Sequence, residues 1–103
     1  MSCNPLETNY LVIQGEVVQI ETLRFTPAGI PLLSLVLRHS SEQIEADMPR
    51  KVECDVNAMI LGSLAEKSES SKVGDKLKVS GFLAKRSLKS TQLVLHIKAL
   101  EKI

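Results

Sequence analysis

The sequence predicts an all-β protein in which five strands form a small barrel and one short helix lies between the third and fourth strands. Apolar and polar residues alternate along several short stretches, which is the pattern of strands with one buried face. The apolar residues are mainly Leu, Val and Ile, with one Tyr, two Phe and no Trp. Clusters of Pro, Gly and Ser separate these stretches. We expect a single domain over residues 1–103, with residues 1–8 as a flexible N-terminus.

The first two strands are predicted over residues 9–21 and 30–38, where apolar side chains recur at every second position. Between them, the segment 26–31 has the composition of a tight turn. Pro27 fixes φ, and Gly29 can take the positive φ that a type II turn requires. The two strands are therefore expected to form an antiparallel hairpin.

The segment 39–51 is polar and predicts a long exposed loop, after which residues 51–56 form the third strand. A short helix is then predicted from Ala58, with Asn57 as its N-cap. The serine cluster over 68–71 would end this helix. The residues that would share one helical face are Met59, Ile60, Leu61, Leu64 and Ala65.

The fourth strand begins after Asp75, and the fifth runs from Gln92 to about Leu100. The resulting order, three strands, a helix and two strands, is that of the OB-fold, a partly open five-stranded barrel. In this fold the ligand lies on the second and third strands, flanked by the loops that join strands one to two and four to five. Here these loops are residues 22–30 and 85–91.

The charge distribution predicts an anionic partner. Residues 72–103 carry eight Lys and Arg against two acids, whereas residues 1–71 carry five against ten. A cationic hairpin tip on a small β domain is suited to binding a phosphate backbone. The candidate DNA contacts are Lys85, Arg86 and Lys89 in the 85–91 loop, with Arg38, Arg50 and Lys51 beside the expected binding face.

Other classes of protein are not supported by the sequence. Cys3 and Cys54 lie far apart without a partner motif, which predicts reduced thiols and a cytoplasmic location. We see no signal peptide and no apolar stretch near the ~20 residues of a membrane helix, so we expect no membrane contact. His39 and His96 lack metal-ligand spacing, and no phosphate-binding glycine loop or nucleophile elbow is present. We therefore expect no metal, no cofactor and no enzymatic activity.

Four segments carry a resemblance to a known family. They are FTPAGIP at 25–31, the end of the following strand at 38–40 (RHS), VSGFLA at 79–84 and LVLH at 93–96. In these segments the chain resembles primosomal replication protein N (PriB), a bacterial replication-restart family related to single-stranded DNA-binding protein. The resemblance covers about residues 9–102.

The resemblance implies a homodimer of OB-folds that binds single-stranded DNA without strong sequence preference. It also implies that the protein assists the PriA helicase at abandoned forks and acts with other primosome proteins. In the family, basic residues of the loop between strands four and five contact DNA, and by position these match Lys85, Arg86 and Lys89. The N-terminal strand is our candidate for the dimer interface.

This chain departs from family members that carry aromatic residues after the second strand, because its residues 39–56 contain none. Stacking on an aromatic contributes roughly 1–3 kcal/mol per base, so we expect weaker and more salt-sensitive binding here. The missing aromatics, with the outward acids Glu53 and Asp55, leave open a protein-interaction module with little direct nucleic-acid binding. An RNA-binding OB domain is a further alternative, since contacts to phosphates do not distinguish ribose from deoxyribose.

Overall fold

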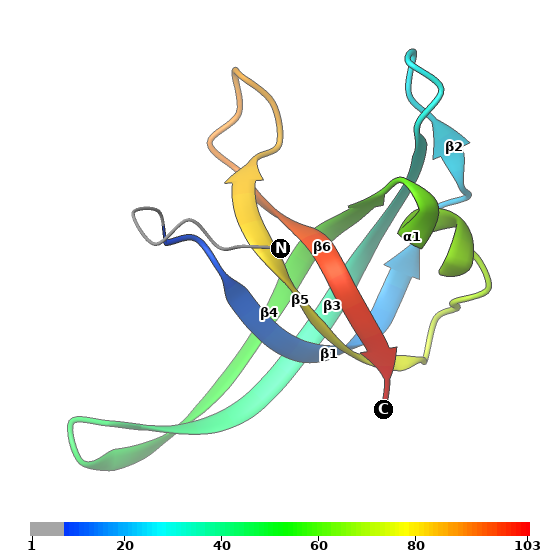
Figure 1. Cartoon of the computed structure of the whole chain (residues 1–103). Coiled ribbons are helices and arrows are strands. Elements are labelled where there is room, and N and C mark those ends of the chain that lie inside the picture. Colours follow the sequence, from blue (N-terminus) through cyan, green and yellow to red (C-terminus); the bar gives the residue numbers. More distant parts are fainter. Residues whose placement is uncertain (1–7) are drawn as a thin grey trace.

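Five long strands wrap into a closed barrel in the computed structural model, which describes residues 8–103 (Figure 1). The barrel order is β1-β5-β6-β4-β3, and a further pairing of β1 with β3 closes it. The predicted five-stranded OB-fold with one short helix is confirmed. The elements are β1 (Leu11–Ile20), β2 (Arg24–Phe25), β3 (Pro31–Glu45), β4 (Met48–Leu61), α1 (Ser63–Lys67), β5 (Lys76–Lys85) and β6 (Leu93–Lys102). The expected flexible N-terminus and Cys3 lie outside the described residues, apart from Thr8.

Strand β1 closes the barrel because it uses both of its edges. Residues 11–16 pair with β5, and residues 16–20 pair with β3, with a register shift between Val17 and Gln19. Strand β1 can pass from its pairing with β5 to its pairing with β3 because Gly15, which has no side chain, lies against β3. A Cβ at Gly15 would be only 2.9 Å from the carbonyl oxygen of Arg38. Glycine is therefore required where the two backbones approach most closely.

The core consists of the inward-facing aliphatic residues of all five long strands and Ala65 of α1. Alternate residues along a strand point to the same side, which explains why Leu33, Leu35 and Leu37 are all buried. Burying one such side chain contributes about 1.5–3 kcal/mol to folding. The remaining core residues are Val17, Ala58, Ile60, Leu77, Val79, Leu95 and Ile97.

The prediction of an exposed loop over 39–51 is wrong. Strands β3 and β4 continue past the barrel as a two-stranded arm, which projects to the lower left in Figure 1. Ala46 and Asp47 form the turn at its tip, with φ angles of 53° and 64°. Two positive φ angles are typical of a type I′ hairpin turn, but the usual Asn-Gly or Asp-Gly signal is absent here. The arm lies beyond the core, so most of its side chains are polar and no hydrophobic alternation marks it. The apolar side chains of Ile44 and Met48 near its tip are exposed.

The predicted helix is shorter than expected, and its predicted start is wrong. Residues 58–61 belong to β4, and the helix begins at Ser63 after Gly62, whose φ is 87°. Ala58 and Ile60 alternate into the core, and Ala58 also pairs with Leu95 of β6. Burial and pairing on both edges outweigh the local helical pattern.

The turn before β3 has the predicted positive φ but not the predicted type. Gly29 has a φ of 82°, and its N–H donates to the carbonyl of Thr26 at 2.8 Å. The central residues of this turn are therefore Pro27 and Ala28, and Ala28 does not have a positive φ. This is a type I turn followed by a left-handed glycine, which is common in three-residue hairpins.

We expect Gly81→Ala to destabilise the barrel by at least about 2 kcal/mol, because overpacking against backbone cannot be relieved by a rotamer change. A Cβ at Gly81 would be 1.8 Å from the carbonyl oxygen of His96, at the bulge where β5 meets β6. Urea unfolding measures the change. Ser80→Ala, one residue away and half-buried, is the matched control and should change stability little. Equal stability of the two variants would contradict this account of the bulge.

Candidate nucleic-acid interface

The outer face of β3 and β4 forms a continuous surface that runs from the barrel onto the arm. Residues directly opposite each other in the β3–β4 ladder point to the same side, and every second pair shares a face. We call this surface the outer strip. Its barrel half contains four apolar side chains, and its arm half is charged up to an apolar pair near the tip. From barrel to arm its pairs are Leu32–Leu61, Ser34–Met59, Val36–Asn57, Arg38–Asp55, Ser40–Glu53, Glu42–Lys51 and Ile44–Pro49.

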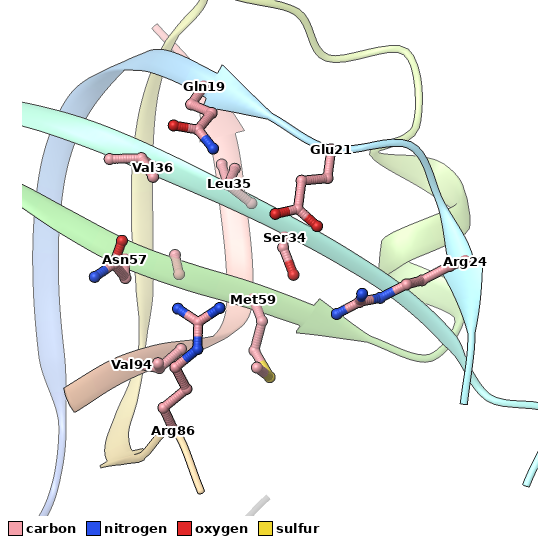
Figure 2. A pocket seen from close by; sticks show the side chains of 11 residues that line it. Gln19, Glu21, Arg24, Ser34, Leu35, Val36, Asn57, Met59, Arg86 and Val94 are labelled. Atoms are coloured by element: carbon pink, nitrogen blue, oxygen red, sulfur yellow. The ribbon is translucent and has the colours of Figure 1, made fainter. Parts of the chain in front are cut away.

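A pocket of about 280 Å³ lies over the barrel half of the outer strip (Figure 2). Val36 and Met59 lie in its floor. Arg24 of β2 and Arg86 of the β5–β6 loop line two of its walls, and their guanidinium groups point into the pocket (Figure 2). The pocket therefore places two permanently charged groups beside the apolar side chains of Val36 and Met59. Its lining also includes the Glu21 carboxylate and the polar side chains of Gln19, Ser34 and Asn57.

A second group of cations lies at the β5–β6 loop, residues 86–92. It consists of Lys85 at the end of β5 and of Arg86 and Lys89 in the loop. The loop is closed by hydrogen bonds from Arg86 N–H to the Gln92 carbonyl (3.0 Å) and from Ser90 N–H to the Ser87 carbonyl (3.1 Å). Among residues 8–103, no carboxylate forms an ion pair with Lys85, Arg86 or Lys89. The positive charge that the sequence predicted at this tip is therefore uncompensated within the described chain.

The other three predicted contacts lie on the arm, and each has an acidic partner. Arg38 forms two hydrogen bonds with Asp55, from Nε to Oδ1 (3.0 Å) and from Nη2 to Oδ2 (3.3 Å). Arg50 Nη1 donates to a Glu45 carboxylate oxygen at 2.9 Å, and Lys51 Nζ lies 3.9 Å from a Glu53 carboxylate oxygen. The six predicted residues thus divide into an uncompensated loop group and a compensated arm group.

The two faces of the arm separate these three cations further. Arg38 and Lys51 belong to the outer strip, whereas Arg50 lies in the alternate register, on the opposite face of the ribbon. Only the first two therefore continue the surface that begins at the pocket.

The Arg38–Asp55 pair changes the titration of both groups. The hydrogen bond from Arg38 lowers the pKa of the Asp55 carboxyl below its ordinary value, because it stabilises the charged form. The same contact raises the pKa of Arg38. Asp55 is therefore a carboxylate, and its pair with Arg38 persists to more acidic pH than an ordinary aspartate would allow.

Comparison with known proteins identifies the family. Residues 9–99 match the model of a family described as another single-strand binding protein family. Replication restart protein PriB of Bordetella pertussis is 38% identical over 95 residues, covering 92% of this chain and 89% of that protein. The chain belongs to the PriB family. The solved structure of PriB from Ralstonia solanacearum matches with a TM-score of 0.84 at 33% identity, over 94% of this chain and all of that one.

The OB-fold of this PriB-family chain also occurs in a more distant protein. The single-stranded DNA-binding protein of Thermus aquaticus matches with a TM-score of 0.77 at 20% identity, over 93% of this chain and 50% of that one. This likeness shows the fold alone. Within the described part of the chain, no group of three His, Cys, Asp or Glu is placed to hold a metal ion. No helix in residues 8–103 is long and apolar enough to cross a membrane.

Sequence reasoning on this PriB-family chain missed Arg24. Arg24 lies in the 22–30 segment that the OB plan places beside the binding face, but it follows Leu23 and precedes Phe25 in an unremarkable local pattern. Its role in the pocket appears only when β2 pairs with β3, which brings Arg24 opposite Leu32 on the outer strip. Its position in that segment was the available signal.

We expect the Asp55 carboxyl carbon to titrate below the ordinary aspartate range in an NMR pH titration, and Arg38→Gln to return its pKa to that range. The physical reason is loss of the hydrogen bond that favours the charged form. The pair's contribution to stability is present above the unfolded-state pKa and is lost as pH falls through the lowered folded-state pKa. An unchanged Asp55 pKa in Arg38→Gln would contradict the assigned cause.

Proposed function

We propose that this PriB-family protein binds single-stranded DNA at the pocket over the barrel half of the outer strip and at the adjoining β5–β6 loop, and that it acts in replication restart. One observation carries the proposal: Arg24 and Arg86 point into one pocket, where they outnumber its single acid, Glu21, beside a loop whose cations have no acidic partner in residues 8–103. Cations bind phosphates in any sequence, which suits a protein that must act on unpaired strands of any composition.

In this proposal, Lys85, Arg86, Lys89 and Arg24 hold the phosphates, and bases lie against the apolar floor at Met59 and Val36. The planes of the two guanidinium groups also offer surfaces on which bases stack. The outer strip contains no aromatic side chain, so stacking energy is low and phosphate contacts dominate. Binding is therefore weak near physiological salt and strong at low salt.

Replication restart enters the proposal through the PriB family. The relatives bear the name replication restart protein, and the resemblance seen in the sequence points to the PriA helicase as the partner. We propose that the protein assists this helicase while holding the single strand. A protein-interaction module with little DNA binding is the second candidate. The acids Glu53 and Asp55 on the outer strip favour it, because they repel phosphates.

We expect the charge-reversed variant Lys85→Glu/Arg86→Glu/Lys89→Glu to lose DNA binding while keeping its fold. Loss of three phosphate contacts lowers the salt slope by about 2 and the affinity near 0.1 M salt by about a hundredfold. Fluorescence anisotropy of a labelled single-stranded oligonucleotide at several salt concentrations measures both quantities.

The matched control reverses three exposed lysines elsewhere, Lys67→Glu/Lys72→Glu/Lys98→Glu, which changes the net charge equally. It should retain most of the affinity. Unchanged affinity in the loop variant would refute the DNA site. Full helicase stimulation by a loop variant that no longer binds DNA would favour the interaction module instead.

We also propose a homodimer, formed through the first half of β1. Residues 11–15 pair with β5 on one edge, and no strand in residues 8–103 pairs with their other edge. An unpaired edge is a template for a strand from another chain. Tyr10 and Val12 beside it are exposed apolar side chains. Antiparallel pairing of two β1 strands would satisfy the edge by two-fold symmetry.

We expect Val12→Asp to shift the protein toward monomer in analytical ultracentrifugation, because two-fold symmetry brings two new carboxylates into one interface. Val73→Asp places the same change at another exposed valine and serves as the matched control. An unchanged dimer dissociation constant in Val12→Asp would exclude this interface.

A further inference from the structure

The strongest unexplained feature of the outer strip is the Arg38–Asp55 pair. Val36 and Asn57 line the pocket, and Arg38 and Asp55 form the next pair along the same face. Two residues along a strand span about 7 Å, so Arg38 is the first cation that a strand leaving the pocket toward the arm would meet. Its side chain is 61% exposed, so solvent and ligands have access to it.

Asp55 holds Arg38 with the same geometry that a phosphate would use. Nε and Nη2 of the guanidinium group each donate to a different carboxylate oxygen. Arginine binds carboxylate and phosphate through this same forked arrangement. A DNA phosphate and the Asp55 carboxylate therefore compete for the same donors.

We propose that Asp55 occupies Arg38 in place of a DNA phosphate. The surface that binds DNA, which we call the DNA track, therefore ends at Arg38 on the outer strip. The inference rests on the proposed DNA-binding function and assigns Asp55 as the residue that limits how many nucleotides the protein contacts. The next pair supports it, because Glu53 lies opposite Ser40 and adds a second negative charge in the same direction. Beyond Arg38, the outer strip carries Glu53 and Glu42 against Lys51 alone, and this excess of negative charge disfavours a phosphate backbone.

A second acid near Arg38 must be included in the test. Glu16 of β1 lies directly opposite Arg38 in the β1–β3 ladder, although it forms no ion pair with Arg38. Arg38 released from Asp55 could turn to Glu16. The double variant Glu16→Gln/Asp55→Asn removes this second partner, so that Arg38 has neither acid to bind.

The experiment measures the affinity of oligo-dT strands of increasing length for the wild type, Asp55→Asn, Glu16→Gln/Asp55→Asn, Arg38→Gln and Arg38→Gln/Asp55→Asn. One added phosphate contact steepens the salt slope by about 0.7, which corresponds to about fivefold tighter binding at 0.1 M salt. We expect Asp55→Asn to show this gain only with strands long enough to reach Arg38. We expect no gain when Arg38→Gln is also present.

Glu45→Gln is the matched control for net charge. It removes one carboxylate and frees Arg50, but on the opposite face of the arm from the outer strip. Its gain should be much smaller than that of Asp55→Asn. An equal gain would show that net charge alone controls affinity and would overturn the proposal.

Two further results would also overturn it. The first is a gain from Asp55→Asn that persists in the Arg38→Gln background, because Asp55 would then act by simple repulsion. The second is the absence of any gain in both Asp55→Asn and Glu16→Gln/Asp55→Asn. The loop variant at Lys85, Arg86 and Lys89 separates these failures from failure of the proposed function. If that variant loses binding while Asp55→Asn changes nothing, only the role of Asp55 is wrong.

Discussion

Pairing of β1 with two different strands is the constraint on which the molecule depends. Its first half pairs with β5 and its second half with β3, and the barrel exists only because both pairings are made. Two glycines permit the necessary close approaches, Gly15 against β3 and Gly81 against β6. The neighbouring strands β6, β4, β3 and β2 bring Arg86 of the β5–β6 loop and Arg24 of β2 to one pocket. Barrel closure adds Gln19 of β1 to the lining of that pocket.

Charge compensation divides that surface into two parts. In the β5–β6 loop, the cations have no acidic partner among the described residues, so their field extends into solvent. On the arm, Arg38, Arg50 and Lys51 each lie beside an acid. A count of Lys and Arg residues in the sequence does not distinguish the loop cations from the arm cations. The distances between opposite charges show that the loop is the better electrostatic target for a phosphate backbone.

The arm extends the sheet without adding to the core, and most of its side chains are polar, although Ile44 and Met48 near its tip are exposed. A hydrophobic arm would expose a flat, aggregation-prone ribbon, whereas cross-strand ion pairs keep it hydrated. The absence of aromatic residues along residues 39–56 means that the arm offers charge and backbone, but no stacking platform. This chemistry is compatible with a short DNA track that stops near Arg38, with the remainder of the arm available to a protein partner.

Local sequence determined those features that depend on alternation and on the chemistry of single residues. The strands around Leu33–Leu37 and Leu77–Val79, the turn glycine at 29 and the basic loop at 85–89 could all be predicted, because each signal lies within a few neighbouring residues. Three features could not. Residues 58–61 have a helical pattern but form strand, because β3 pairs with all four and β6 pairs with Ala58 and Met59 on the other edge. The arm carries no hydrophobic period because nothing covers it. The placement of Arg24 beside the pocket depends on its pairing with Leu32. Asp55, which is 17 positions from Arg38 in the sequence, becomes its neighbour only when β3 and β4 pair.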